Sequence, residues 1–246
     1  MIIGSDIIFK ENLPSTNTYA SRILRDENIK EGTIIYTNYQ SAGRGHAGNG
    51  WESEDGKNLL FSVLLFPSMV TPAEQFTISI AISLGICDFL ERYIPACSIK
   101  WPNDIYVNSD KIAGILIENT IMGNTIENSV AGIGLNVNQV KFLSDSPNPV
   151  SLKGITGLDY DLSSCLAQLA SDLDKRYKQV ISEDYILLRK EYISKLFRLN
   201  EQAGFRDQNG IFSGRIVSVS DSGRLRVETS SGTEKEYSFK EIEFII

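Results

Sequence analysis

The chain has 246 residues, enough for one large domain or for a domain of about 200 residues with a small appendage. Apolar residues make up 42% of it and charged residues 22%, which is the balance of an ordinary globular protein. The net charge of −7 argues against a general nucleic-acid-binding protein and against a membrane-surface protein, since both favour a basic body.

Cysteine usage and the N-terminus indicate the cellular setting. Cys87, Cys97 and Cys165 are an odd number of thiols without a CxxC spacing, which fits a reducing, cytoplasmic environment. The first residues lack the charged segment and apolar run of a signal peptide. The apolar runs look too short for a membrane-spanning helix, so we expect no membrane association.

Helices and strands are expected in a mixed order along the chain. Helical patterns cover about 15–27, 71–93, 162–180 and 183–198, and strand patterns cover 33–40 and 58–66. The second strand is continuously apolar, as expected when both faces of a strand are buried. Residues 98–138 predict consecutive antiparallel hairpins, and residues 139–160 predict a loop rich in proline, glycine and serine.

The sequence pattern changes after residue 200, where short strand patterns alternate with tight turns at 221–223 and 231–232. This pattern predicts a small β-barrel. We therefore expect an α+β fold with two domains: residues 1–199 form a mixed or antiparallel sheet flanked by helices, and residues 200–246 form the barrel.

A glycine-rich loop, QSAGRGHAGNGWES at 40–53, contains the only histidine of the chain, His46. Its GxGxxG spacing matches a dinucleotide-binding turn, but no helical pattern follows, and no acidic residue stands about 20 residues later. The loop also lacks the Gly-Lys-Ser/Thr of a P-loop. Two interpretations stay open: a surface hairpin, or a loop whose backbone amides and Arg44 hold an anion and which ends at Trp51.

Two further regions combine polar side chains with strand patterns. In KWPND (100–104), Pro-Asn-Asp is typical of a turn, but Asn103 and Asp104 could also face a cleft, where an amide reads a base and a carboxylate holds Mg²⁺. The segments DKIAGILIE (110–118) and AGIGLNVN (131–138) carry glycines inside apolar strands, which often mark close approach of a ligand. Neighbouring strands of this kind predict a groove for a flat apolar ligand.

Taken together, these segments resemble the biotin protein ligases. The resemblance runs in order through STN (15–17), QSAGRGHAGNGW (40–51), KWPND (100–104), KIAGILIE (111–118), GIGLNVN (132–138) and NPVSLKGITG (148–157). It implies a catalytic domain like that of class II aminoacyl-tRNA synthetases, followed by an SH3-like barrel. The implied reaction joins biotin to Mg-ATP as biotinyl-5′-AMP and then transfers biotin to a lysine of a biotin carboxyl carrier domain.

The resemblance also implies the site residues. The biotin site would comprise Ser15, Thr16, Asn17, Gln40, Gly43, Arg44, Gly45, His46, Lys111, Gly114, Gly132 and Gly134, and the ATP site Arg44, Trp51, Lys100, Asn103, Asp104, Lys111 and Asn136. Arg44 and Lys111 are the expected catalytic cations, and Asp104 is the expected magnesium ligand. Many family members carry arginine where this chain has His46, so we expect Arg44 and Lys111 to hold the intermediate here.

Because STN lies at residues 15–17, we expect a monofunctional ligase without the N-terminal DNA-binding domain of bifunctional members, and a homodimer is a candidate assembly.

Three alternatives accompany this assignment. A lipoate or octanoate ligase of the same fold is the nearest alternative. A biotin-sensing regulator without catalysis and a nicotinamide-dependent oxidoreductase are the others, the last weakened by the context of the glycine loop.

Overall fold

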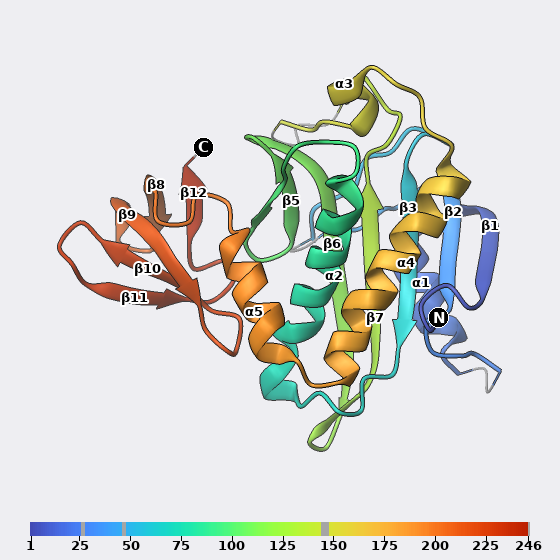
Figure 1. Cartoon of the computed structure of the whole chain (residues 1–246), viewed down its shortest axis with the longest axis horizontal. Helices are drawn as coiled ribbons and strands as arrows, with labels where there is room; N and C mark the ends of the chain where they lie inside the picture. Colours follow the sequence, from blue (N-terminus) through green and yellow to red (C-terminus); the bar gives the residue numbers. More distant parts are fainter. Residues whose placement is uncertain (26–27, 46–47, 144–147, 246) are drawn as a thin grey trace.

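The computed structural model describes residues 1–25, 28–45, 48–143 and 148–245 (Figure 1). The helices are α1 (Thr16–Ile23), α2 (Phe76–Leu90), α3 (Leu152–Thr156), α4 (Leu162–Ile181) and α5 (Tyr185–Ser194), with a 3₁₀ turn at Pro72–Glu74. The strands are β1 (Ile7–Leu13), β2 (Ile34–Gln40), β3 (Leu59–Leu65), β4 (Ser98–Lys100), β5 (Asp104–Val107), β6 (Asp110–Met122), β7 (Thr125–Leu135), β8 (Gln202–Asp207), β9 (Gly210–Val219), β10 (Leu225–Thr229), β11 (Glu234–Tyr237) and β12 (Glu243–Ile245).

Strands β1 to β7 form one sheet in the order β1-β2-β3-β7-β6-β5-β4. The pair β1–β2 is parallel and the other neighbours are antiparallel, so the sheet is mixed and the expected α+β class is confirmed. The hairpins expected over residues 98–138 are the strands β4 to β7. This meander brings segments of the glycine-rich strands side by side without any crossover.

Helices cover both faces of the sheet. Leu64 packs in a small cluster with Ala20 of α1, whereas Phe61 and Val63 of the same strand pack in the main core with α2 and α4. All seven residues of β3 are therefore buried, as its continuous apolar run predicts. Figure 1 shows α2, α4 and α5 together on one face of the sheet.

Local capping sets where two of the helices begin. The Ser15 side chain accepts from the backbone N–H of Thr18 at the start of α1, and the Asp161 carboxylate accepts from the N–H of Ser164 at the start of α4. These bonds satisfy amides that have no partner inside the helix. Helix α1 ends at Ile23, earlier than the residue 27 that the apolar pattern predicts.

Four elements differ from the sequence-based expectation. A short helix, α3, lies inside the predicted loop 139–160, where Ser151 caps it through the N–H of Gly154. One turn of helix is too short to show apolar periodicity. Strand β1 was not expected because it is an exposed edge without alternation, and β12 is only three residues long. The predicted helix 71–93 is divided into the 3₁₀ turn and α2.

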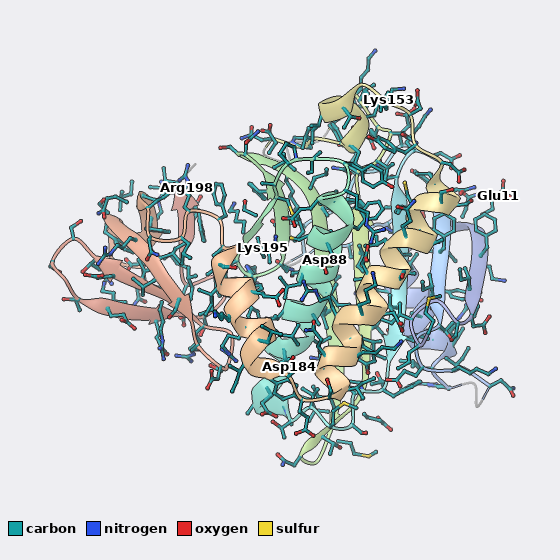
Figure 2. All side chains as sticks on the ribbon, in the orientation of Figure 1. Glu11, Asp88, Lys153, Asp184, Lys195 and Arg198 are labelled. Carbon is teal, nitrogen blue, oxygen red and sulfur yellow. The ribbon has the colours of Figure 1, made fainter. Side chains whose placement is uncertain are left out.

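The segment Pro72–Leu90 also corrects the expectation that no apolar run could span a membrane. By length and composition it is sufficient, with a mean hydropathy of 1.3, but 72% of it is buried inside the fold. Such burial is typical of the core helix of a globular protein. Ion pairs hold it there: Arg176 of α4 contacts Asp88 of α2 at 2.6 Å, and Lys195 contacts Glu91 just after α2. Figure 2 labels Asp88 and Lys195 on the helical side of the sheet.

Strands β8 to β12 form a separate antiparallel sheet in the order β11-β10-β9-β8-β12, with Phe205 fully buried in its core. This sheet lies beyond α5 in Figure 1. Hydrogen bonds from several segments attach it to the rest of the chain; among them, Trp101 Nε1 donates to the Gly223 carbonyl at 2.9 Å, and Arg198 donates to the Ile245 carbonyl at 3.0 Å. The first bond starts from the KWPND segment, so the small sheet contacts an expected site region.

Candidate active site

The register of the large sheet brings the separate sequence motifs together. Asp104 of β5 stands opposite Gly114 of β6, which stands opposite Gly134 of β7. The next row towards α1 contains Gly132 of β7 opposite Ser62 of β3. Residues far apart in the sequence therefore form two adjacent rows on the face of the sheet that α1 covers.

The glycines in these rows make room for side chains of the protein itself. A Cβ built on Gly134 would lie 2.4 Å from the Trp51 ring, and one on Gly114 would lie 2.8 Å from it. A Cβ on Gly132 would lie 2.2 Å from Asn17 Oδ1. The sequence predicts this groove as a place for a ligand. In the structure Trp51 fills it, because the preceding loop folds back onto the sheet.

The described parts of that loop, residues 43–45 and 49–51, pair as the two strands of a short hairpin. Arg44 and Gly50 form a β-bridge, Gly45 N–H donates to the Asn49 carbonyl at 2.7 Å, and Trp51 N–H donates to the Gly43 carbonyl at 3.0 Å. A Cβ on Gly43 would lie 2.6 Å from the Trp51 carbonyl oxygen, so the two hairpin strands require glycine there. Trp51 Nε1 is buried without a hydrogen-bond partner among the described residues.

One expected site residue, His46, lies outside the described residues. The hairpin on either side of it corresponds to the first of the two interpretations of the glycine loop, a hairpin on the surface of the sheet. Its ends nevertheless bring Arg44 and Trp51 onto the site face, as the second interpretation requires.

A buried polar cluster stands beside Gly132 at the start of α1. Gln40 Oε1 accepts from the Thr16 N–H at 2.7 Å and from the Thr16 hydroxyl at 3.1 Å. Ser62 Oγ lies 2.7 Å from both Thr16 Oγ1 and Asn17 Oδ1. Ser15, the helix cap, is 4% exposed, and Thr16, Asn17 and Ser62 are equally buried, whereas Gln40 is partly exposed. The sequence-predicted residues of the STN segment and Gln40 therefore do meet.

The sequence analysis did not select Ser62. Its signal was present, however, since it is the single hydroxyl in the apolar run 59–65. A buried polar group is costly unless it is hydrogen-bonded, so a serine inside such a strand marks a polar partner across the core.

Arg44 binds a carboxylate on the sheet. Its Nη2 lies 2.7 Å from Glu118 Oε1 and 2.6 Å from Oε2, and Asn17 Nδ2 donates to the same Oε2 at 2.8 Å. Glu118, like Ser62, is not among the predicted site residues, although it ends the segment KIAGILIE. It joins the glycine loop to the polar cluster.

Lys111 forms a separate ion pair with Asp104 at 2.7 Å, and its Nζ lies 5.6 Å from the centre of the Trp51 ring. Both side chains of the pair are about one-quarter exposed, with 25% for Lys111 and 27% for Asp104. This pair stands at the opposite end of the two rows from Glu118, beside the C-terminal end of β7.

The two expected catalytic cations are therefore not adjacent. Glu118 follows Gly114, the partner of Asp104, by four residues along β6, which separates their Cα atoms by about 13 Å. Arg44 and Lys111 each have their own carboxylate, and the expectation that both hold one intermediate stays a prediction.

Lys100 lies next to Asp104 in the sheet register and extends towards the small sheet. Its Nζ donates to the Tyr106 hydroxyl at 3.1 Å and lies 5.4 Å from the Phe244 ring centre. Burial lowers the pKa of Lys100, and the negative charge of Asp104 partly opposes this effect. Lys100 therefore places a second cation beside the ion pair of Lys111 and Asp104.

Comparison with known proteins identifies the arrangement. Residues 9–136, more than half of the chain, match the model of the Biotin/lipoate A/B protein ligase family. The chain belongs to this ligase family. Residues 199–244 match the Biotin protein ligase C terminal domain, so the small sheet has its own counterpart.

Several members of the family are similar over nearly the full chain. The bifunctional ligase/repressor BirA of Bacillus subtilis is 29% identical over 245 residues, which cover 96% of this chain and 74% of that protein. The biotin–[acetyl-CoA-carboxylase] ligase of Paracoccus denitrificans is 28% identical over 89% of this chain and 93% of its own length. The structure of the Aquifex aeolicus biotin protein ligase in complex with biotin and ATP superimposes with a TM-score of 0.80, at 26% identity and covering 97% and 98% of the two chains.

In this ligase Asn103 and Asn136, the two asparagines expected at the adenine end of the ATP site, differ in the hydrogen-bonding groups that their side chains leave open. Asn103 Nδ2 donates to the Ile115 carbonyl and is thus committed to β6. Asn136 Nδ2 donates to the Val150 carbonyl at 3.1 Å, but Asn136 Oδ1 is buried without a partner among the described groups. A buried acceptor of this kind is open to an N–H donor of a ligand.

Residues 148–150, inside the predicted loop 139–160, support both Lys111 and Asn136. Lys111 N–H donates to the Asn148 carbonyl at 2.7 Å, and Val150 N–H donates to the Lys111 carbonyl at 2.9 Å. The same Val150 carbonyl holds the Asn136 amide. Backbone groups of the segment NPVSLKGITG therefore hold Lys111 and Asn136 in place at this end of the site.

Proposed function

We propose that the chain is an ATP-dependent biotin protein ligase. In the first step a carboxylate oxygen of biotin attacks the α-phosphorus of ATP, the bond to pyrophosphate breaks, and biotinyl-5′-AMP forms. In the second step the amine of a carrier-domain lysine attacks the carbonyl carbon, AMP leaves, and the nitrogen loses a proton. The names of the similar proteins support this reaction.

The observation that carries the proposal is a buried polar cluster at one end of the site and an ion pair with a lysine at the other. Thr16, Asn17, Gln40 and Ser62 supply hydrogen-bonding groups away from water. The ureido ring of biotin can use the donors and acceptors that this cluster leaves open, such as Gln40 Nε2, whereas the acyl chain of octanoate or lipoate would leave them unpaired at a cost of about 1–3 kcal/mol each. The cluster therefore favours biotin over the lipoate alternative.

At the other end, Lys111 is the proposed catalytic cation. A carboxylate that approaches the α-phosphate meets like charge, and a fixed cation reduces this repulsion as the bond forms. The backbone N–H and carbonyl of Lys111 both form hydrogen bonds with residues 148–150, which fixes its main chain, and its side chain is held by the ion pair with Asp104. The unpaired Asn136 Oδ1 is suited to accept from the amino group of adenine, and Lys100 is a candidate contact for the polyphosphate.

Arg44 and Trp51 take a different proposed role. Arg44 is tied to Glu118 near the polar cluster, so we assign it to closing the glycine loop over the biotin ring. Trp51 leaves the groove beside Gly134 when the ligand enters and packs over the adenylate. Closure of this kind would protect the mixed anhydride from water.

Magnesium would accompany ATP as part of the substrate. The described ranges contain no cluster of three or more His, Cys, Asp or Glu side chains that could hold a metal ion. Mg²⁺ commonly combines one carboxylate with substrate phosphates, and Asp104 beside Lys111 fits that single position. The ion would neutralise phosphate charge, while Asp104 would also orient Lys111.

The organisation and partners follow the same proposal. Residues 1–199 would form the catalytic domain and residues 200–246 the C-terminal domain, with a biotin carboxyl carrier domain as protein partner. A cytoplasmic location suits the three free, buried cysteines. Absence of DNA binding and of membrane association, and formation of a homodimer, stay predictions.

Biotin-dependent exchange of pyrophosphate into ATP tests the proposal directly. The purified chain should catalyse exchange with biotin and Mg²⁺, and should then label a carrier domain in which the acceptor lysine is intact but not one with lysine replaced by arginine. Exchange with lipoate or octanoate but not with biotin would transfer the assignment to the lipoate branch of the family. Saturable binding of biotin without any exchange would instead indicate a sensor.

A further inference from the structure

The side chains around the STN segment form one continuous hydrogen-bonded chain. It runs from Gln40 through Thr16, Ser62 and Asn17 to Glu118, and its links measure 3.1, 2.7, 2.7 and 2.8 Å. These side chains come from α1, β2, β3 and β6. Arg44 of the glycine loop binds the far end of the chain through Glu118.

The carboxylate of Glu118 decides the direction of the hydrogen bonds. An ionised carboxylate only accepts, so Asn17 must turn its Nδ2 towards Glu118, where it also donates to the Leu116 carbonyl at 3.1 Å. Asn17 Oδ1 then faces Ser62 and can only accept. The single hydroxyl hydrogen of Ser62 therefore serves two acceptors, Asn17 Oδ1 and Thr16 Oγ1.

Thr16 Oγ1 accepts from Ser62 and donates its own hydrogen to Gln40 Oε1. Gln40 Oε1 already accepts from the Thr16 N–H, which leaves Gln40 Nε2 as the free donor of that amide. The order of donors and acceptors in the cluster thus depends on Ser62, which is fully buried and faces Gly132.

We propose that Ser62 is a positioning residue for substrate recognition: together with Glu118 it sets the donor and acceptor pattern that Thr16, Asn17 and Gln40 present to the ring of the acid substrate. This inference rests on the proposed function, because it assigns the ring of biotin to this cluster. Ser62 acts through its neighbours. Its loss should therefore weaken binding of biotin while leaving binding of ATP intact.

The test is pyrophosphate exchange by Ser62→Ala, with Ser129→Ala as matched control. Ser129 is equally buried in the adjacent strand β7, but its hydroxyl has no hydrogen-bond partner among the described residues. Ser62→Ala should raise the KM for biotin roughly tenfold to a hundredfold, with the KM for ATP and kcat changed by about twofold or less. Ser129→Ala should leave all three near the wild-type values.

Glu118→Gln provides an independent measurement that does not depend on core packing, because the Glu118 side chain is 39% exposed. It should raise the KM for biotin by about twofold to fivefold and leave the KM for ATP unchanged. The double variant should lose less than the product of the single effects, since both residues belong to one chain of bonds.

The outcomes separate this inference from the proposed function. Equal changes in the KM values for biotin and ATP, or a Ser62→Ala enzyme that behaves like Ser129→Ala, would overturn the positioning role while the ligase assignment stands. If Ser62→Ala does not fold, an unchanged KM for biotin in Glu118→Gln overturns it instead. A wild-type chain without biotin-dependent exchange would overturn both.

Discussion

Replacement of Gly132 by alanine tests the geometry at the centre of the site. The added methyl carbon would lie 2.2 Å from Asn17 Oδ1 and 2.8 Å from Asn17 Cγ, closer than real Cβ contacts. Asn17 cannot move away freely, because it donates to the Leu116 carbonyl and accepts from Ser62. Either β7 must shift within the sheet or the Asn17 side chain must give up its buried hydrogen bonds.

The expected cost follows from these contacts. Overpacking a core costs about 1–3 kcal/mol, and a buried polar group left without its partner costs about 1–3 kcal/mol. Removing a strand glycine returns about 0.5–1 kcal/mol of backbone entropy. We therefore expect Gly132→Ala to lower the free energy of unfolding by about 2–4 kcal/mol and to weaken biotin binding.

Urea unfolding followed by circular dichroism measures the first effect, and titration calorimetry with biotin measures the second. Gly204→Ala is the matched control: it is also a strand glycine, and its new methyl would meet the nearest atom, Ile245 Cβ, at an ordinary 3.4 Å. The control should stay within about 1 kcal/mol of the wild type. If Gly132→Ala were no less stable than Gly204→Ala, Asn17 would not be held against the strand as described.

Three further predictions address the rest of the site. Lys111→Ala should reduce pyrophosphate exchange by about 10²- to 10³-fold with an unchanged circular dichroism spectrum, and a loss below tenfold would remove Lys111 from the catalytic role. In a Trp101→Phe background, biotin and ATP together should change the fluorescence of Trp51 as its ring leaves the glycine groove; an unchanged spectrum during active turnover would contradict displacement. Burial, with smaller contributions from Asp104 and Asp110, raises the pKa of Tyr106 to about 12 from 10.0. Its protonated form therefore contributes stability that is complete below pH 10 and lost as the pH rises towards 12, so Tyr106→Phe should show a smaller fall in unfolding free energy over that interval in urea titrations.

Much of the site could be predicted because its parts carry local signals. The serine cap before α1, the glycines inside β6 and β7, and the polar turn after β4 each differ from what a plain core segment would contain. The continuous apolar run of β3 likewise predicts burial on both faces, which the structure confirms. Family resemblance then connects these segments in one order along the chain.

The residues missed were those whose role depends on a partner across the sheet. Ser62 and Glu118 are ordinary in their own segments and become informative only opposite Gly132 and beside Arg44. Strand β1 escaped prediction for a related reason: as an exposed edge it buries little, so its sequence lacks alternation and its pairing with β2 supplies the order.

The amino-acid sequence by itself determined the α+β class, the elements that line the site, and the residue types needed for its chemistry, because propensity, capping and apolar periodicity act over a few neighbouring residues. Only the tertiary structure decided which of those residues meet. Trp51 occupies the groove of Gly114 and Gly134, while Arg44 pairs with Glu118 of β6 and Lys111 pairs with Asp104 of β5. Strand register sets such contacts, and a shift of one residue would turn every side chain to the other face.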